Sequence, residues 1–164
     1  MIISLKQVKN FLINVFIPFI VGISSHIVIQ LCSGSTASRI YIELSKPSFA
    51  PNETIFFMCW TVVLIMLGIS AFMAFKNDCN VAKTKDAMFY YTMTLVLSFL
   101  WGILFFGFNF RFSALVCLLM IIITFIFLII KFSRVNRRSG YINLINLVII
   151  LYIGFINYFL WILN

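Results

Sequence analysis

Few side chains in this sequence are equipped for chemistry, and the single histidine is the first of them. His26 lies about two thirds of the way along a long apolar run. An imidazole there could contact a ligand or serve as an axial ligand to a porphyrin metal. It could equally be a neutral histidine hydrogen-bonded to neighbouring helices. Because one chain holds one histidine, a bis-histidine haem within the chain is excluded.

The three tryptophans are the next candidates. Trp60 and Trp101 lie within apolar runs, whereas Trp161 lies close to the end of the sequence. A buried indole N–H needs a hydrogen-bond partner, and flat rings around a cavity suit a flat hydrophobic ligand. Ordinary core packing is the alternative for Trp60 and Trp101. The position of Trp161 is typical of an anchor at the membrane–water interface.

Carboxylates are absent from every apolar run. The four acidic residues lie between the runs, at Glu43, Glu53, Asp78 and Asp86. Proton-coupled pumps and cation carriers normally need a carboxylate inside the membrane, so the sequence disfavours those classes. With no acid to orient the histidine, and no G-x-S-x-G or phosphate-binding loop, nucleophilic catalysis and phosphoryl transfer find no support.

The cysteines show no metal-binding spacing. They stand at Cys32, Cys59, Cys79 and Cys117, without a C-x-x-C pair. Small apolar residues or free thiols are therefore favoured over a disulfide or a metal cluster.

Membrane-spanning helices must position these residues. Of the 164 residues, 63% are hydrophobic and 10% are charged, against about 25% charged in soluble domains. Residues of the apolar runs do not alternate with polar ones, as they would in barrel strands. The sequence predicts an all-α membrane protein, a five-transmembrane-helix bundle in a single domain over residues 1–164. The expected helices are 11–32, 55–75, 87–108, 112–130 and 141–163.

Small and polar residues inside the runs predict how the helices pack. Interhelical hydrogen bonds are expected from Ser98, Asn143, Asn146 and Asn157. Close approach of neighbouring helices is expected at Gly22, Gly68, Gly102 and Gly154. The segment Gly107–Arg111 is the expected turn between the third and fourth helices.

Basic residues give the bundle a direction. Nine of the 12 lysines and arginines lie on the side that carries the N-terminus, so the positive-inside rule places that terminus in the cytoplasm. The net charge of +8 is spread between apolar runs and forms no stripe, so a nucleic-acid partner is not expected. The first run continues to Cys32, which favours a retained helix over a signal peptide. Without an Arg- and Ser-rich transit segment, a bacterial inner membrane is the favoured location.

The segment between the first two runs, residues 33–54, contains a recognisable motif. Its prolines restrict the residues before them to extended conformations, so we expect an ordered segment. Asn52 or Thr54 is expected to cap the following helix. The motif Lys46-Pro47-Ser48-Phe49-Ala50-Pro51, followed by Trp60-Thr61, resembles the K-P-x-W-x-P-P…W-T signature of the TspO/MBR family. Members of this family are also called translocator proteins, tryptophan-rich sensory proteins and peripheral benzodiazepine receptors.

Two further stretches fit the same family. Trp101–Gly107 is similar to its W-x-P-x-F-F-G motif, and Asn157 with the final Leu163-Asn164 is similar to its ending. The resemblance implies a five-helix bundle, often a homodimer, that contacts membrane lipid. It also implies binding of a tetrapyrrole such as protoporphyrin IX or haem as a ligand, with no obligatory cofactor. The implied pocket residues are His26, Phe49, Phe56, Phe57, Trp60, Trp101, Ser113, Val116, Met120, Ile153, Ile156 and Asn157.

The chain departs from the family pattern at residues tied to chemistry. Thr54 and Ile149 stand where the family has tryptophans, Ile103 replaces a proline, and Ile162 replaces the basic residue of a sterol-recognition pattern. The resemblance therefore implies a binder that transports, senses or regulates its ligand. A light-dependent porphyrin-degrading enzyme and a regulatory membrane partner without a ligand are the alternatives.

Overall fold

The computed structural model describes residues 5–75 and 81–164, and within them the chain is helical with no strand. Five of the described helices are long and apolar enough to cross a membrane, which confirms the predicted fold class. The elements are α1 (Leu5–Ser33), α2 (Ala37–Glu43), α3 (Glu53–Phe75), α4 (Val81–Gly102), a π-helical turn η1 (Ile103–Gly107), α5 (Arg111–Val135) and α6 (Arg137–Leu163).

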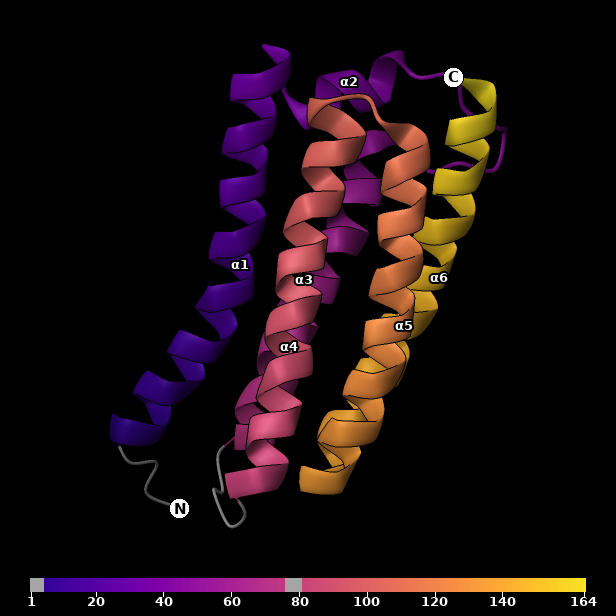
Figure 1. Ribbon diagram of the computed structural model, residues 1–164. Coiled ribbons are helices and arrows are strands. Elements are labelled where there is room, and N and C mark those ends of the chain that lie inside the picture. Colours follow the sequence, from indigo (N-terminus) through magenta and orange to yellow (C-terminus); the bar gives the residue numbers. More distant parts are fainter. Residues whose placement is uncertain (1–4, 76–80) are drawn as a thin grey trace.

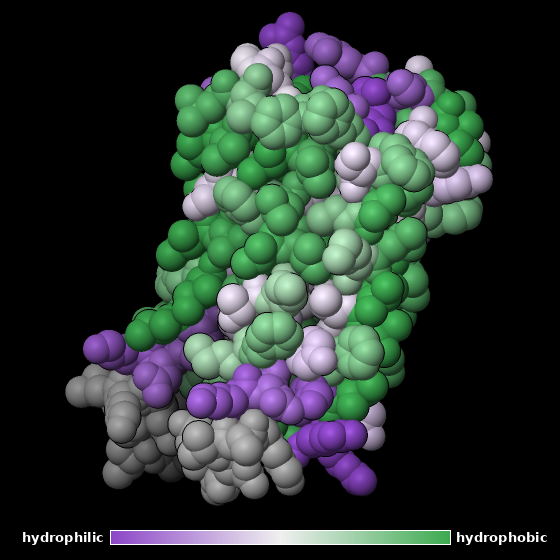
Figure 2. Space-filling model, viewed as in Figure 1, coloured by the Kyte–Doolittle hydropathy of each residue, from purple (hydrophilic) through white to green (hydrophobic). Residues whose placement is uncertain are grey.

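The five long helices form a closed ring. α1 packs against α3 and α4, α3 packs against α6, and α5 completes the ring between α6 and α4. The short helix α2 lies at the end that carries the C-terminus, opposite the N-terminus (Figure 1). We call this the α2 end. Figure 2 shows hydrophobic side chains along the length of the bundle and hydrophilic ones at both ends, as expected of a membrane-spanning domain.

The joint between the last two helices is shorter than the sequence indicated. The fourth and fifth helices were expected to end at 130 and begin at 141, but only Asn136 separates α5 from α6. Lys131 and Arg134 lie in the last turns of α5 and Arg138 in the first turn of α6. The apolar run ends at the first charged residue, but the helix does not. Lysine and arginine are good helix formers, and their charged groups can extend to water from the end of a membrane-spanning helix. The Asn136 side chain accepts from the Arg138 N–H at 3.0 Å and caps α6.

The segment before α3 is ordered, as expected, and contains the unpredicted helix α2. Its buried Tyr41 donates to the Pro51 carbonyl at 2.9 Å and stacks on Phe56 with ring centroids 4.6 Å apart. Asn52 is the cap of α3, because its side chain accepts from the Ile55 N–H at 2.9 Å. Burial, followed by the nearby charges, raises the pKa of Tyr41 to about 12. The phenol therefore stays neutral and keeps its hydrogen bond at neutral pH.

The same segment is fastened to the last helix. The Ser45 N–H donates to the Asn164 side-chain oxygen at 2.9 Å, and the Asn164 amide donates to the Ser45 carbonyl at 3.0 Å. The Lys46 ammonium donates to the carbonyls of Tyr41 and Ile42 at 2.8 and 3.0 Å. Residues 37–52 thus form a cover that is held to both α3 and α6.

Glycines allow α1 to lie close to its neighbours. A Cβ on Gly68 would lie 2.7 Å from the Val15 Cα, and one on Gly102 would lie 2.6 Å from the Ser25 Oγ. A Cβ on Gly22 would lie 2.8 Å from a Leu64 methyl carbon. The predicted close approach is confirmed at these three glycines. It is wrong for Gly154, where an added Cβ would meet nothing closer than 3.5 Å.

Polar side chains join α3 to α6 in the N-terminal half of the bundle. The Ser70 hydroxyl approaches the Asn143 side-chain oxygen at 3.1 Å, and the Ser139 hydroxyl donates to the Ser70 carbonyl at 2.6 Å. The Asn146 amide donates to the Val63 carbonyl at 3.4 Å. These bonds confirm the predicted interhelical role of Asn143 and Asn146, at about 0.6–2 kcal/mol each.

Candidate ligand site

A narrow hollow, the inner cleft, lies where α1, α3 and α4 meet in the half of the bundle near the α2 end. Its volume is about 20 Å³, which is room for about one water molecule. None of the residues that border it is acidic or basic, apart from His26. They are Val21, Gly22, Ser25, His26, Ile29, Phe56, Phe57, Trp60, Leu64, Ser98, Phe99, Trp101, Gly102 and Phe106.

Stacked and tilted aromatic rings form the wall of the inner cleft. The Trp60 and Trp101 ring centroids lie 4.6 Å apart, and Phe56 lies 6.5 Å from Trp101. Phe57 continues the wall to Phe106, with centroids 5.8 Å apart. Such ring pairs stabilise the packing by about 0.5–1.5 kcal/mol beyond area burial. The wall is therefore a preformed aromatic surface, whose neighbouring rings are tilted by 38° to 39° to one another.

The π-helical turn η1 shapes one side of this wall. Its closing bond runs from the Phe108 N–H to the Ile103 carbonyl at 3.0 Å, and it buries Phe105 and Phe106 side by side. Single π-helical turns are frequent at functional sites. The sequence showed the Trp101–Gly107 motif but gave no signal for this turn.

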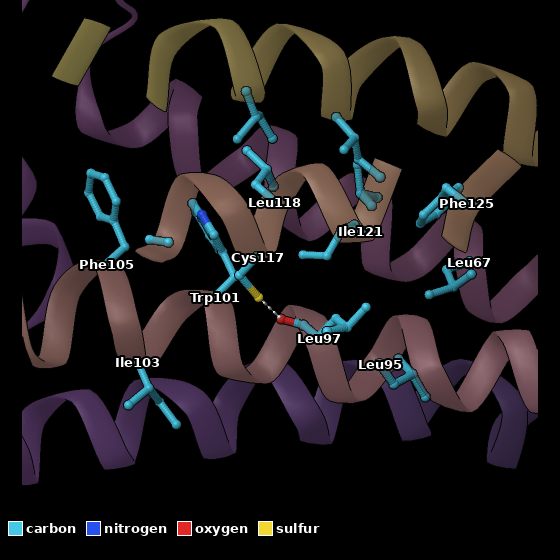
Figure 3. Packing of buried hydrophobic residues seen from close by; sticks show 14 of the residues in the cluster. Leu67, Leu95, Leu97, Trp101, Ile103, Phe105, Cys117, Leu118, Ile121 and Phe125 are labelled. Carbon is cyan, nitrogen blue, oxygen red and sulfur yellow. Dashed lines mark hydrogen bonds between the residues drawn. The ribbon is translucent and has the colours of Figure 1, made fainter. Parts of the chain in front are cut away.

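Several buried polar atoms have no hydrogen-bond partner among the described residues, including the Tyr91 hydroxyl, the Arg111 Nε and the Asn146 side-chain oxygen. Two more such groups lie in the half of the bundle that holds the inner cleft. The Trp101 indole nitrogen is one, on a side chain that is 3% exposed. The Asn157 amide is the other, with both its nitrogen and its oxygen unpartnered and 2% of the residue exposed. In Figure 3 Trp101 points from α4 into the packed interior, where Leu118 and Ile121 of α5 lie. Each unpartnered group costs about 1–3 kcal/mol.

Four predicted site residues lie at a common depth. His26 and Trp60 stand seven residues from the α2 ends of α1 and α3, and Trp101 and Asn157 stand six residues from the α2 ends of η1 and α6. At 1.5 Å per residue this is about 9–10 Å below the helix ends. We call these four residues the aromatic layer. Ser98, predicted to bond between helices, instead borders the inner cleft at 8% exposure, and no hydrogen bond joins it to another helix in the described part of the chain.

His26 borders the inner cleft and also a second, larger hollow. This side groove, of about 570 Å³, opens between α1, α2 and α3. The residues that border it are His26, Thr36, Ala37, Ser38, Glu53, Thr54, Phe57, Met58, Thr61 and Val62. His26 is exposed and lies 5.5 Å from Phe57, centroid to centroid. No hydrogen bond joins it to any residue that the structure describes, so the expected bond to a neighbouring helix is absent there.

Other predicted pocket residues lie elsewhere. Val116 and Met120 lie on the outward face of α5, at 42% and 51% exposure, and are separated from the inner cleft. Phe49 packs on Phe155 of α6 outside the cleft, with centroids 5.4 Å apart. Ser113 borders a third hollow, near the α4–α5 turn. Ile153 and Ile156 are fully buried core residues of α6, on the same helix as Asn157.

The contribution of α1 was largely missed. Gly22, Ser25 and Ile29 border the inner cleft beside His26. Their spacing of three and four residues places them on one face of the helix. This spacing of small residues was the one feature of the sequence that could have identified the face of α1 that lines the cleft, because every other face of the run is apolar as well.

Three of the cysteines lie within the described residues. Cys32, Cys59 and Cys117 are free, and the Cys117 thiol approaches the Leu97 carbonyl at 3.5 Å (Figure 3). Cys79 lies outside the described residues. Over residues 5–75 and 81–164, no three His, Cys, Asp or Glu side chains come together as a metal site.

Comparison with known proteins places this geometry in context. The model of the TspO/MBR family matches residues 14–162. A "Tryptophan-rich protein TspO" of Archaeoglobus fulgidus is 30% identical over 125 residues, which cover 76% of this chain and 79% of that protein. A protein of the same name from Chlorobaculum tepidum is 26% identical over 104 residues, covering 63% of this chain and 66% of that protein.

Proposed function

The chain belongs to the TspO/MBR family of membrane proteins, and from this premise we propose that it binds a flat hydrophobic tetrapyrrole inside its helix bundle. The ligand would be a porphyrin such as protoporphyrin IX or haem, held at the aromatic layer for transport, sensing or regulation. The indole rings of Trp60 and Trp101 offer apolar aromatic contact beside the inner cleft, and apolar walls with few polar groups are usual in ligand sites.

The observation that carries this proposal is the unpartnered polar groups in the layer. Native proteins pair nearly all buried polar atoms, so each exception calls for an explanation. The Trp101 indole nitrogen and the Asn157 amide are buried on different helices at the same depth. A ligand with polar atoms on a flat apolar frame would satisfy both, whereas core packing alone leaves them costly.

Binding requires the inner cleft to widen, because 20 Å³ is far below the roughly 300–1,000 Å³ of ligand pockets. Among the helices around the inner cleft, α1 is the least buried. In its most apolar stretch 17% of the residues are buried, whereas 56% are buried in that of α4. Pro18 interrupts the backbone bonding of α1 midway, since it has no N–H to offer the Asn14 carbonyl. Movement of the half of α1 beyond Pro18 would join the inner cleft to the side groove.

The distribution of basic residues supports a proposed orientation in the membrane. The N-terminal end carries Lys131, Arg134, Arg137 and Arg138, whereas the α2 end carries Arg39, Lys46 and Arg111. We infer a cytoplasmic N-terminus in a bacterial-type inner membrane. A homodimer is a further prediction from the family resemblance.

A fluorescence titration tests the proposal. Protoporphyrin IX is added to the protein in lipid nanodiscs, and tryptophan emission is followed. We expect quenching at micromolar ligand that is reduced in Trp60→Phe and Trp101→Phe. Trp161→Phe is the matched control, because Trp161 lies at the α2 end and borders neither the inner cleft nor the side groove. Absence of quenching in the wild-type protein would overturn the proposal.

A further inference from the structure

His26 is the feature of the side groove that the proposed function does not explain. We propose that His26 is an axial ligand to the iron of a haem bound where the inner cleft meets the side groove. This inference rests on the proposed function, because it specifies which tetrapyrrole the site favours and how. The neutral imidazole donates a nitrogen lone pair to the iron, a water leaves the iron, and no electron is transferred.

The position of His26 makes it available to a ligand from either hollow. His26 and Phe57 are the two residues that border both the inner cleft and the side groove. The imidazole is exposed toward the groove and is not part of the packed core. A ligand in the cleft, in the groove or across both would therefore lie beside this ring.

The imidazole also lacks a partner within the protein. It makes no hydrogen bond to any described residue, and its one described ring contact is with Phe57. It lies seven residues, about 10 Å, from the α2 end of α1. Because the ring is exposed to the groove, a ligand there could reach its nitrogens without displacing a hydrogen bond of the protein. Coordination of a metal carried by the ligand would satisfy one nitrogen.

The side groove has the size and chemistry for the rest of such a ligand. Its volume of about 570 Å³ falls within the usual range for ligand sites. Phe57, Met58 and Val62 supply apolar contact along α3. The hydroxyls of Thr36 and Ser38 gather at the α2 end, where the carboxylates of a haem would need polar surroundings.

Glu53 is expected to weaken haem binding. It is the one acidic side chain among the residues that border the groove, and no ion pair joins it to another described residue. It begins α3 at the α2 end, where the haem carboxylates are expected, and a propionate beside it would be repelled. Glu53→Gln is therefore expected to tighten haem binding.

The test compares an iron-containing and a metal-free tetrapyrrole. Hemin and protoporphyrin IX are titrated separately into the full-length protein in nanodiscs, with the Soret band and tryptophan emission as readouts. His26→Ala and His26→Gln should weaken hemin binding by about tenfold or more and should shift the Soret band. Affinity for protoporphyrin IX should change by less than about threefold. Added imidazole should restore the wild-type hemin spectrum in His26→Ala.

Thr92→Val is the matched control. Thr92 lies on α4 and borders neither the inner cleft nor the side groove, and its hydroxyl donates to the Met88 carbonyl at 3.0 Å within the same helix, so the variant keeps the shape and removes no atom near the ligand. We expect its hemin spectrum to equal that of the wild type. A wild-type hemin spectrum and affinity in His26→Ala would overturn the inference, as would equal weakening of hemin and protoporphyrin IX. If the wild-type protein binds neither compound, the proposed function itself fails.

Discussion

Replacement of Asn157 by leucine should stabilise the ligand-free protein and weaken ligand binding. Both polar atoms of the Asn157 side chain are buried without a partner among the described residues. Leucine, which has the same branched outline but is larger, removes this cost of about 1–3 kcal/mol. For a domain of 150–250 residues, each kcal/mol raises the melting temperature by about 2–4 °C. The expected increase for Asn157→Leu is therefore several degrees.

A second asparagine of the same helix provides the control. Asn143 is also fully buried, but its side-chain oxygen is within 3.1 Å of the Ser70 hydroxyl and its amide donates to the Ser139 carbonyl. Asn143→Leu breaks the link between α3 and α6 and should lower stability by about 0.6–2 kcal/mol. Because both variants exchange asparagine for leucine in a buried position of α6, opposite signs would point to the difference in hydrogen bonding between the two sites.

The assay is thermal unfolding in detergent, followed by size-exclusion chromatography of the heated protein, with and without protoporphyrin IX. Ligand should raise the melting temperature of the wild-type protein and should raise that of Asn157→Leu much less. The reasoning is refuted if Asn157→Leu is destabilised as much as Asn143→Leu. It is also refuted if the ligand-dependent increase is the same in Asn157→Leu and the wild type.

Three further predictions concern helix packing, the cover and catalysis. Gly68→Ala should destabilise the protein by about 1–3 kcal/mol, because the new Cβ would meet the Val15 backbone at 2.7 Å, whereas Gly154→Ala should be nearly neutral; chemical denaturation measures both. As pH rises from about 10 to 12, the unfolded chain loses its phenol proton before folded Tyr41 does, so the free energy of unfolding should fall. In Tyr41→Phe this decrease in the free energy of unfolding between about pH 10 and 12 should be smaller. The same pH dependence in Tyr41→Phe and the wild type would contradict the prediction. Illumination of bound protoporphyrin IX should bleach its absorbance no faster than in empty nanodiscs, and rapid loss would favour the enzyme alternative.

The fold was largely predictable from the sequence because lipid imposes a simple rule. A run of about 20 apolar residues must be helical to satisfy its backbone, so hydropathy locates the spans. The same rule fails at the ends, where charged residues continue a helix into water. For this reason the segment between the last two helices was expected to be longer than the single residue Asn136. Helix α2 was missed because seven residues between turn signals carry too little periodicity to identify a helix.

The site was predictable only in part. Trp60, Trp101 and His26 were recognisable because polar or amphipathic rings are unusual in apolar runs. Which of the other residues face inward depends on the order of the helices in the bundle and on the rotation of each helix about its axis. A helix that is apolar on every face has no polar side to indicate that rotation. Val116 and Met120 were therefore expected in the pocket, although they face outward.

The most direct test of the account is a structure of the protein with protoporphyrin IX bound in a lipid environment. The account predicts the porphyrin ring against Trp60 and Trp101, with the half of α1 beyond Pro18 displaced from α3 and α4 and with Asn157 in contact with the ligand. A porphyrin bound on the outward face of α5, with the inner cleft still closed, would contradict it.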